Sequence, residues 1–339
     1  MPTTEATVEP IQLSATIQAV ADEARRGLTS TPKTLVPWLF YDEAGSRLFE
    51  QITALPEYYL TRTERDLFTA HANEIFRTIG ANLTIAELGA GTAAKTGILL
   101  RALARIQSAV LYQPIDISPT ALEEAREQLE YMPGLTVHSQ TANYVTESVR
   151  IERPAHTRIL ALYIGSSIGN FAPTEALDIL IRLRSELLLG DALLLGTDLA
   201  PGLAHTGPAK SVATLLAAYN DSQGVTAAFN RNILIRLNRD LGADFRPERF
   251  LHRALWNSTH SRMEMHLESL SAQTIHIPAN SAGAAFTIQF AAGESIHTEN
   301  SYKFTPAGIA DLLAAARFTP IRTFADLQNL FAVTLATAV

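Results

Sequence analysis

Residues 84–96 read TIAELGAGTAAKT, and this stretch decides the fold of the chain. Residues 85–88 are mostly apolar and fit a short buried strand, and Gly89-Ala-Gly91 then form a tight turn. Thr92 and Lys95 stand where a helix would begin. Glycine has no Cβ, so such a strand–turn–helix unit brings backbone N–H groups close to a ligand. The stretch therefore predicts a nucleotide-type ligand at the end of the strand.

The spacing of the glycines separates two kinds of nucleotide ligand. A dinucleotide site has the pattern G-x-G-x-x-G, and Ala94 stands where its third glycine would fall. The pattern E-x-G-x-G instead resembles the glycine loop of class I S-adenosylmethionine (AdoMet) methyltransferases. A plain strand-to-helix turn remains an alternative for so short a motif.

A second predicted strand, residues 109–118, carries Asp116, which lies 25 residues after Gly91. An acidic side chain at the tip of a second strand can accept hydrogen bonds from a ribose diol. The alternative is that Asp116 caps the helix that begins at Pro119. Ser118 can supply that cap, so we expect Asp116 to bind ribose.

Strands and helices alternate from residue 84 to residue 197. Further strands are predicted at 135–139, 159–165 and 192–198, with crossover helices at 121–131 and 173–188. Strands with so continuous an apolar character fit a parallel sheet covered on both faces. We therefore predict an α/β fold, a Rossmann-like class I AdoMet methyltransferase domain with its ligand at the carboxyl ends of the strands. The loop IGSSIGN, 164–170, leaves the fourth strand at that edge and is predicted to line the pocket; a plain turn is the alternative.

The segments outside this alternating region are different in character. Residues 1–10 fit a loose tail, and helices are predicted at 11–26, 44–55 and 63–79. A loop at 201–208, helices at 212–219 and 223–240 and a closing helix and strand at 306–315 and 330–338 follow. Between them, strands are predicted at 253–258, 262–271, 273–277, 286–290 and 295–301. The predicted parts are an N-terminal helical segment contributing to the substrate site (1–62), the Rossmann-like AdoMet-binding domain (63–200), an inserted, strand-rich α+β substrate-binding domain (201–305) and a C-terminal helix and strand (306–339).

The composition excludes several classes of protein. A hydrophobic fraction of 47% with 18% charged residues fits a packed globular core. The net charge of −7 and the pI of about 5.7 argue against a nucleic-acid partner. With no cysteine, disulfides, thiolate catalysis and cysteine-bound zinc are excluded. We find neither a secretory signal nor a membrane-spanning run, so a cytoplasmic protein is expected.

Two further kinds of catalytic site are unsupported by motif. The nine histidines form no H-E-x-x-H pattern, so no metal is expected. There is no G-x-S-x-G elbow for Ser-His-Asp catalysis. The adjacent Tyr58 and Tyr59 follow a proline, and we expect one hydroxyl to face a cavity or water because neighbouring residues cannot both point into one core.

Five longer segments together resemble the L-histidine Nα-methyltransferases of ergothioneine biosynthesis. They are YDEAGSRLFEQITALPEYYLTRTE (41–64), ELGAGTAAKT (87–96), IGSSIGN (164–170), AAYNDSQGVTAAFNRN (217–232) and HTENSYKF (297–304). They occur in the family's order, from about residue 26 to the C-terminus. The resemblance implies an AdoMet-dependent enzyme that methylates the α-amino group of histidine three times and yields S-adenosylhomocysteine. We expect a monomer. Its substrates would be L-histidine and the mono- and dimethylated forms, and its product hercynine.

The resemblance also implies which residues bind AdoMet. Gly89 matches the glycine loop, Lys95 the lysine that reaches the methionine carboxylate, and Asp116 the ribose-binding acid. The family usually has Asp-Phe at the adenine edge, whereas this chain has Asn143-Tyr144. Asparagine can still accept a hydrogen bond from the adenine amino group, and tyrosine can still stack.

On the substrate side, the resemblance assigns residues to each end of histidine. Asn170 and Tyr219 match groups that hold the α-amino and carboxylate end, and Glu299 and Ser301 match the pair that bonds the imidazole. The remaining substrate residues implied are Gly165, Met265 beside the ring, and the aromatic wall Tyr41, Phe49 and Tyr58. Catalytic roles are implied for Tyr41, Tyr58 and Asn170.

The chemistry of the residues agrees with this assignment. Methyl transfer from a sulfonium needs a neutral amine in line with the methyl group rather than a nucleophilic side chain. An aromatic wall disfavours a bare ammonium and tolerates a methylated cation. From the residues alone, Glu299 could equally be an exposed strand residue. The alternative functions are an Nα-methyltransferase for another aromatic amino acid, of the tryptophan type, and a non-catalytic AdoMet-binding protein.

Overall fold

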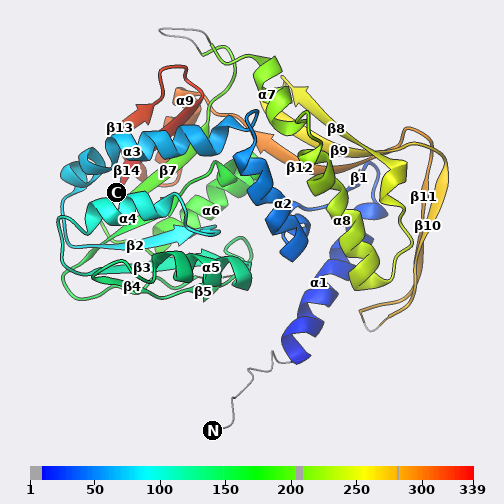
Figure 1. Ribbon diagram of the computed structural model, residues 1–339, viewed down its shortest axis with the longest axis horizontal. Helices are drawn as coiled ribbons and strands as arrows, with labels where there is room; N and C mark the ends of the chain where they lie inside the picture. Colours follow the sequence, from blue (N-terminus) through cyan, green and yellow to red (C-terminus); the bar gives the residue numbers. More distant parts are fainter. Residues whose placement is uncertain (1–9, 148, 204–208, 281) are drawn as a thin grey trace. The chain divides into compact units, whose positions relative to one another are not determined.

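The computed structural model describes residues 10–147, 149–203, 209–280 and 282–339 (Figure 1). The predicted N-terminal tail and most of the loop predicted at 201–208 lie outside these residues. The chain divides into two compact units. The Rossmann unit comprises Thr53–Ala218, Trp256–Met263 and Asn300–Val339; the small-sheet unit comprises Met1–Ile52, Tyr219–Leu255 and Glu264–Glu299.

The Rossmann unit is built on an eight-stranded sheet with the order β13-β14-β7-β6-β2-β3-β4, in which β5 also pairs with β3. Its strands are β2 (Leu83–Leu88), β3 (Val110–Asp116), β4 (Leu135–Val137), β5 (Gln140–Thr141), β6 (Arg158–Tyr163), β7 (Ala192–Asp198), β13 (Phe318–Ala325) and β14 (Phe331–Ala338). Strands β2 to β7 run parallel, and β14 and β13 add antiparallel to one edge. The order reverses at β2, which lies between β3 and β6, and such a switch point is where open α/β sheets bind ligands.

The sheet is covered on both faces, as its apolar strands predict. Along β6, Ile159, Ala161 and Tyr163 pack in one core with residues of α6 and α9, while the alternate residues Leu160 and Leu162 are equally buried. Successive side chains of a strand point to opposite faces, so apolar layers lie on both sides of the sheet. The helices of this unit are α3 (Tyr59–Ile79), α4 (Thr96–Leu103), α5 (Pro119–Leu129), α6 (Pro173–Ser185), α7 (Val212–Tyr219) and α9 (Pro306–Ala315).

The sequence predictions for this unit are confirmed apart from three elements. Strand β5, Gln140–Thr141, was not predicted, because two polar residues carry no apolar pattern. Helix α3 begins at Tyr59, four residues before the predicted start. No element was predicted over residues 318–325, where β13 lies and pairs with β14 along its length. Its exposed side chains and internal Pro320 give it a weak apolar pattern, and pairing with the buried β14 is what makes it a strand.

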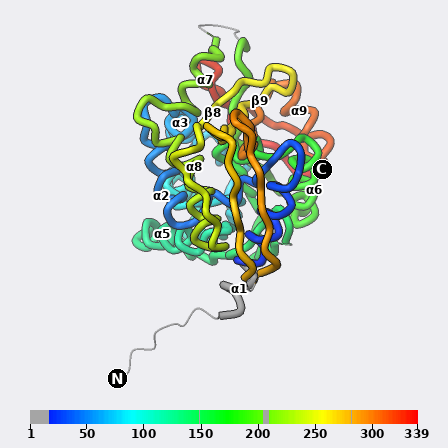
Figure 2. Tube along the Cα trace, turned by 90° about the vertical axis from the view of Figure 1, so that its right-hand side faces the viewer, coloured from blue at the N-terminus to red at the C-terminus, as the bar shows by residue number. Residues whose placement is uncertain are grey.

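The small-sheet unit contains the sheet β1-β12-β9-β8 and a separate two-stranded ribbon, β10-β11. The strands are β1 (Lys33–Thr34), β8 (Phe250–Asn257), β9 (Arg262–Ser269), β10 (Gln273–Ile277), β11 (Phe286–Phe290) and β12 (Ser295–Tyr302); β8, β9 and β12 continue into the Rossmann unit. Strands β10 and β11 run side by side (Figure 2). The helices are α1 (Pro10–Leu28), η1 (Pro37–Phe40), α2 (Glu43–Ala54), α8 (Val225–Leu241) and η3 (Pro247–Arg249). The short β1 was missed because two residues carry no periodicity.

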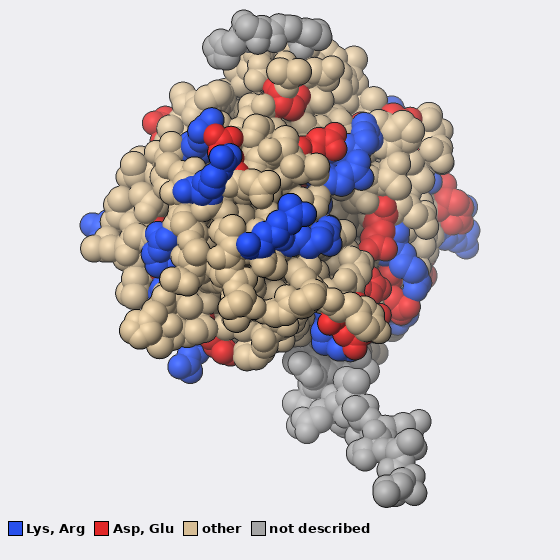
Figure 3. Space-filling model, turned by 60° about the vertical axis from the view of Figure 1, so that its left-hand side comes forward, with Lys and Arg blue, Asp and Glu red and all other residues tan. Residues whose placement is uncertain are grey.

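Two surface properties bear on the class of protein. Acidic and basic side chains are interspersed over the face drawn in Figure 3. Among the described helices, none combines the length and apolar character needed to cross a membrane.

Candidate cofactor site and substrate residues

The glycine turn lies at the switch point of the large sheet. Gly89 and Gly91 have φ values of 68° and 52°, a conformation that side chains with a Cβ rarely adopt. The N–H of Gly89 donates to the carbonyl of Ile115 at 2.8 Å, which ties the turn to the end of β3. A Cβ on Gly89 would lie 3.3 Å from the hydroxyl of Tyr144. The turn thus brings bare backbone to the aromatic residue predicted at the adenine edge.

Asp116, the predicted ribose-binding residue, ends β3 beside this turn. Its two carboxylate oxygens accept the N–H groups of Gly91 and Ser118, each at 2.9 Å. Ser118 caps α5 by accepting the N–H of Ala121, so the predicted helix cap is confirmed. Burial raises the pKa of Asp116. The carboxylate also fixes the glycine turn, a role that the sequence did not indicate.

Lys95, the predicted methionine-carboxylate residue, forms an ion pair with Glu64 of α3. Glu64 is fully buried and accepts the N–H of Gly165 at 2.8 and 3.0 Å through its two oxygens. A Cβ on Gly165 would lie 3.3 Å from Lys95 Nζ. The structure therefore brings Lys95 and Gly165 together through Glu64, which sequence reasoning missed because a carboxylate in a helix normally lies outside.

Asn143 and Tyr144 follow β5 at the same edge of the sheet. The side-chain oxygen of Asn143 accepts the N–H of Val145 at 3.1 Å, so it shapes its own loop. Tyr144 packs edge-on against Tyr163, with ring centroids 5.8 Å apart. Burial raises the pKa of Tyr144 to about 12. A neutral tyrosine is thus held beside the glycine turn.

The loop after β6 lies where the sequence predicted it. Gly165 and Ser166 both have positive φ, and residues Ser167–Asn170 form the 3-10 helix η2. Ser166 is not a glycine, and its hydroxyl accepts the N–H of Asp198 at 2.8 Å, which stabilises this backbone. Asn170 ends η2 and is half-buried.

Glu87, within the E-x-G-x-G pattern, is a second missed residue. It is buried in β2 and accepts the hydroxyls of Thr96, at 2.8 Å, and of Tyr112, at 2.5 Å. Burial raises its pKa to about 7 against the lowering effect of these bonds. Glu87 therefore ties the start of α4 to β2 and β3 from beneath the glycine turn.

A buried charged cluster occupies the end of β7. Asp198 accepts the hydroxyl of Tyr59 at 2.8 Å and the ammonium groups of Lys210 and Lys303 at 2.5 and 2.7 Å. Lys303 Nζ also donates to Ser301 Oγ at 2.8 Å. Burial alone would raise the pKa of Asp198, but the two lysines outweigh it and the pKa is lowered. The same cluster settles the role of Tyr59, whose hydroxyl faces a carboxylate.

Tyr58, the other member of the adjacent pair, precedes α3 and is also buried. Its carbonyl accepts a hydrogen bond from Arg62 at 3.3 Å.

In the small-sheet unit, two of the predicted aromatic residues lie together. The rings of Tyr41 and Phe49 meet edge to face at 5.8 Å, and both pack on Phe229 of α8 at 5.9 and 6.0 Å. Phe40 stacks on Phe229 at 4.6 Å and is fully buried. Tyr41 and Phe49 remain half-buried, so their rings contribute both to the core and to an accessible aromatic surface.

A buried polar network connects the predicted residues Tyr219 and Met265. His252 donates through Nε2 to the carbonyl of Tyr219 and accepts from Asn230 Nδ2 at Nδ1, both at 2.9 Å. Thr298 donates its hydroxyl to Asn230 Oδ1 at 2.7 Å or to the carbonyl of Met265 at 3.0 Å. Burial lowers the pKa of His252, which keeps the imidazole neutral. The network fixes the backbone beside both predicted residues.

Glu299 lies near the end of β12 and is half-buried. Its backbone carbonyl accepts a hydrogen bond from His297 Nε2 at 3.1 Å.

The reversal of strand order at β2, the bare glycine turn and the acidic residue at the tip of β3 define a Rossmann-like methyltransferase of class I. A model of the family described as "Histidine-specific methyltransferase, SAM-dependent" matches residues 20–338. The chain belongs to this family.

Curated relatives agree with this membership. The chain is 39% identical to the histidine N-alpha-methyltransferase of Mycolicibacterium smegmatis, over 94% of this chain and 95% of the relative. It is also 39% identical to the histidine N-alpha-methyltransferase of Mycobacterium tuberculosis, over 94% of each chain. The ergothioneine biosynthesis protein 1 of Neurospora crassa is 34% identical over 62% of this chain and 23% of its own length.

Proposed function

We propose that this protein transfers methyl groups from AdoMet to the α-amino nitrogen of L-histidine, giving hercynine and S-adenosylhomocysteine in the first step of ergothioneine biosynthesis. The observation that carries the proposal is the family match over residues 20–338, together with two histidine N-alpha-methyltransferases at 39% identity over nearly the whole chain. Cytoplasmic location and a monomeric state stay predictions from the sequence.

For AdoMet, we assign each predicted residue a separate contact. Gly89 gives the ligand access to the backbone, and Lys95 binds the methionine carboxylate. Asp116 accepts the ribose hydroxyls with lone pairs beyond those used by Gly91 and Ser118. Asn143 and Tyr144 bind the adenine edge and ring.

For the imidazole of histidine, we assign opposite hydrogen-bonding roles to Glu299 and Ser301. A carboxylate can only accept, so Glu299 takes the imidazole N–H. Ser301 Oγ already accepts from the ammonium of Lys303, which has no acceptor, so the hydroxyl hydrogen of Ser301 points elsewhere. This supports Ser301 as donor to the other, unprotonated imidazole nitrogen, with Met265 packed beside the ring. A phenyl ring returns neither bond, and an indole has an N–H for Glu299 but no second nitrogen to accept from Ser301.

For the amino-acid end, Asn170 and Tyr219 bind the α-amino and carboxylate groups, and Gly165 lines this end. Tyr41, Phe49 and Tyr58 form the aromatic wall around the amine. The reaction is an in-line displacement in which the amine lone pair attacks the methyl carbon as the bond to sulfur breaks. An α-amino group has a pKa of about 8, so a substantial neutral fraction exists near neutral pH. Cation–π contact with the wall tolerates the methylated products, which supports three transfers at one site.

The proposal is tested by mass spectrometry of purified protein incubated with AdoMet and the twenty amino acids. We expect a gain of three methyl groups on histidine alone. Trimethylation of tryptophan instead would contradict histidine as the substrate. AdoMet binding without any methyl transfer would contradict the proposed enzyme activity.

The role of Glu299 in histidine recognition is tested with Glu299→Gln, and Glu268→Gln on β9 is the matched control. Losing a charge-assisted bond of about 1.5–3 kcal/mol should lower kcat/KM for histidine roughly 10- to 150-fold. AdoMet affinity should not change, and the control should retain full activity because Glu268 pairs with the exposed Arg253. Unchanged histidine turnover in Glu299→Gln would contradict the role of Glu299.

A further inference from the structure

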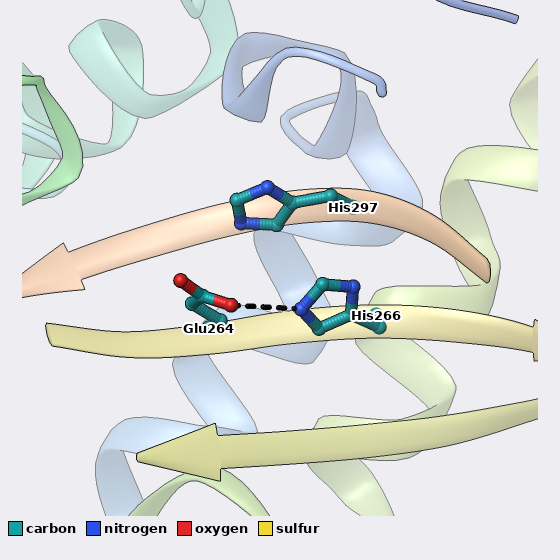
Figure 4. A group of neighbouring side chains, drawn as sticks. All are labelled: Glu264, His266 and His297. Atoms are coloured by element: carbon teal, nitrogen blue, oxygen red, sulfur yellow. Dashed lines mark hydrogen bonds and ion pairs between the residues drawn. The ribbon is translucent and has the colours of Figure 1, made fainter. Parts of the chain in front are cut away.

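Three metal-ligating side chains gather on neighbouring strands of the small-sheet unit. Glu264 and His266 are two residues apart on β9, and His297 is on β12. Their ligand atoms all lie within 4.8 Å of one another, and each residue is half-buried. Figure 4 shows the carboxylate of Glu264 beside the same edge of the two imidazole rings. No local sequence motif indicates this cluster, because 30 residues separate His266 from His297 in the chain.

The arrangement follows from the sheet. Side chains two residues apart on a strand share a face, and a facing residue on the next strand completes the group. The rings of His266 and His297 stack with centroids 4.6 Å apart and planes at 17°. His266 Nε2 lies 3.2 Å from Glu264 Oε2. Both histidines and the carboxylate therefore belong to one cluster on one face of the β9–β12 pair.

The backbone beneath the cluster is held by the buried network on Asn230. Asn230 Nδ2 donates to the carbonyl of His266 at 3.1 Å, and Asn230 Oδ1 accepts from Thr298, the neighbour of His297. These bonds fix the strand backbone that carries the two histidines. A tetrahedral site needs ligand atoms roughly 3.4 Å apart, closer than the 4.8 Å within which they now lie, so binding draws the three side chains together.

We propose that Glu264, His266 and His297 form a binding site for a divalent transition metal of the zinc type, which clips β9 to β12. Two imidazoles and one carboxylate are a known ligand set for Zn²⁺, which fills its fourth position with water. Hard cations such as Mg²⁺ prefer all-oxygen ligands and do not suit this set. The site uses none of the side chains assigned to AdoMet or histidine, and it adds a metal where the sequence predicts none.

Binding at His297 has a consequence for its protonation. His297 Nε2 lies 3.1 Å from the carbonyl of Glu299, and a carbonyl only accepts, so Nε2 carries a proton. A metal that takes this nitrogen breaks the hydrogen bond and moves the proton to Nδ1, so the ring stays neutral. A metal that takes Nδ1 instead leaves the hydrogen bond to Glu299 in place.

The test is isothermal titration of tag-free, EDTA-treated full-length protein with ZnCl₂. We expect one Zn²⁺ per chain and no binding of MgCl₂. His266→Ala and His297→Ala should each weaken Zn²⁺ binding at least tenfold. His276→Ala removes an exposed histidine of β10 outside the cluster and should bind Zn²⁺ like the wild type.

A second measurement separates metal binding from folding. Zn²⁺ should raise the Tm of the wild type and of His276→Ala, and should leave the Tm of His266→Ala and His297→Ala unchanged. Glu264→Gln keeps the shape of the side chain and should also weaken Zn²⁺ binding. It therefore tests the proposal when an alanine variant fails to fold. Wild-type protein that binds no Zn²⁺, or variants that bind it as tightly as the wild type, would overturn the proposal.

Discussion

Replacing Lys95 with methionine tests two roles of one ammonium group, its pairing with Glu64 and its proposed contact with the AdoMet carboxylate. The side chain of Glu64 is 0% exposed and that of Lys95 is 22% exposed. Breaking a buried ion pair from one side costs about 3–5 kcal/mol, because the other charge stays buried. Glu64 keeps its two bonds to the Gly165 N–H, so we expect the low end, about 3 kcal/mol of unfolding free energy.

Loss of the ammonium group also weakens AdoMet binding. A hydrogen bond between charged groups contributes about 1.5–3 kcal/mol, so AdoMet should bind roughly 10- to 150-fold more weakly. Urea unfolding measures the stability and isothermal titration measures AdoMet affinity.

The double variant Lys95→Met/Glu64→Gln separates the two effects. Glutamine removes the buried charge and can still accept the N–H of Gly165, so stability should largely return while AdoMet affinity stays low. Arg47→Met is the control, because Arg47 pairs with Glu43 on the surface and should cost less than about 1 kcal/mol. Wild-type AdoMet affinity in Lys95→Met would refute the cofactor role. A double variant as unstable as the single one would refute the role of Glu64.

Two further predictions concern buried carboxylates. Asp198→Asn leaves the ammonium groups of Lys210 and Lys303 buried without their counter-charge and should lower the unfolding free energy by about 3–5 kcal/mol in urea; a loss below 1 kcal/mol would contradict this. Glu87 has a folded pKa of about 7 against 4.5 in the unfolded chain, so the folded state holds a proton that the unfolded state releases. Its contribution to stability is therefore present below pH 4.5 and lost as the pH rises through about 7, by up to about 3 kcal/mol. In urea unfolding, the unfolding free energy of Glu87→Gln relative to the wild type should increase by about that amount between pH 5 and pH 8. Parallel pH profiles of the two proteins would contradict the raised pKa.

Most of the Rossmann unit could be predicted because local patterns decided it. Short apolar runs bounded by turn residues make up β2, β3, β6 and β7, and a strand buried on both faces needs that composition. Ser118 was likewise recognisable as a helix cap from its place before Pro119. Strand β13 carried no such pattern, since it is stabilised by its pairing with β14.

The candidate cofactor residues were predictable where they follow a strand directly. Gly89 and Asp116 end β2 and β3, so adjacent parallel strands place them at one edge. Their supporting partners were not predictable. Glu64 lies 101 residues from the Gly165 whose N–H it accepts, and nothing in a helical run distinguishes a buried carboxylate from a solvated one.

The sequence by itself determined the fold class, the glycine turn and the family, because these depend on short contiguous stretches whose backbone conformation is set locally. Only the tertiary structure decided which polar groups are buried and paired. Asp198 meets Lys210 and Lys303, and His266 meets His297, across sequence separations that no periodicity encodes. The physical reason is that burial makes an unpartnered polar group costly, and the fold alone determines which partners are within reach.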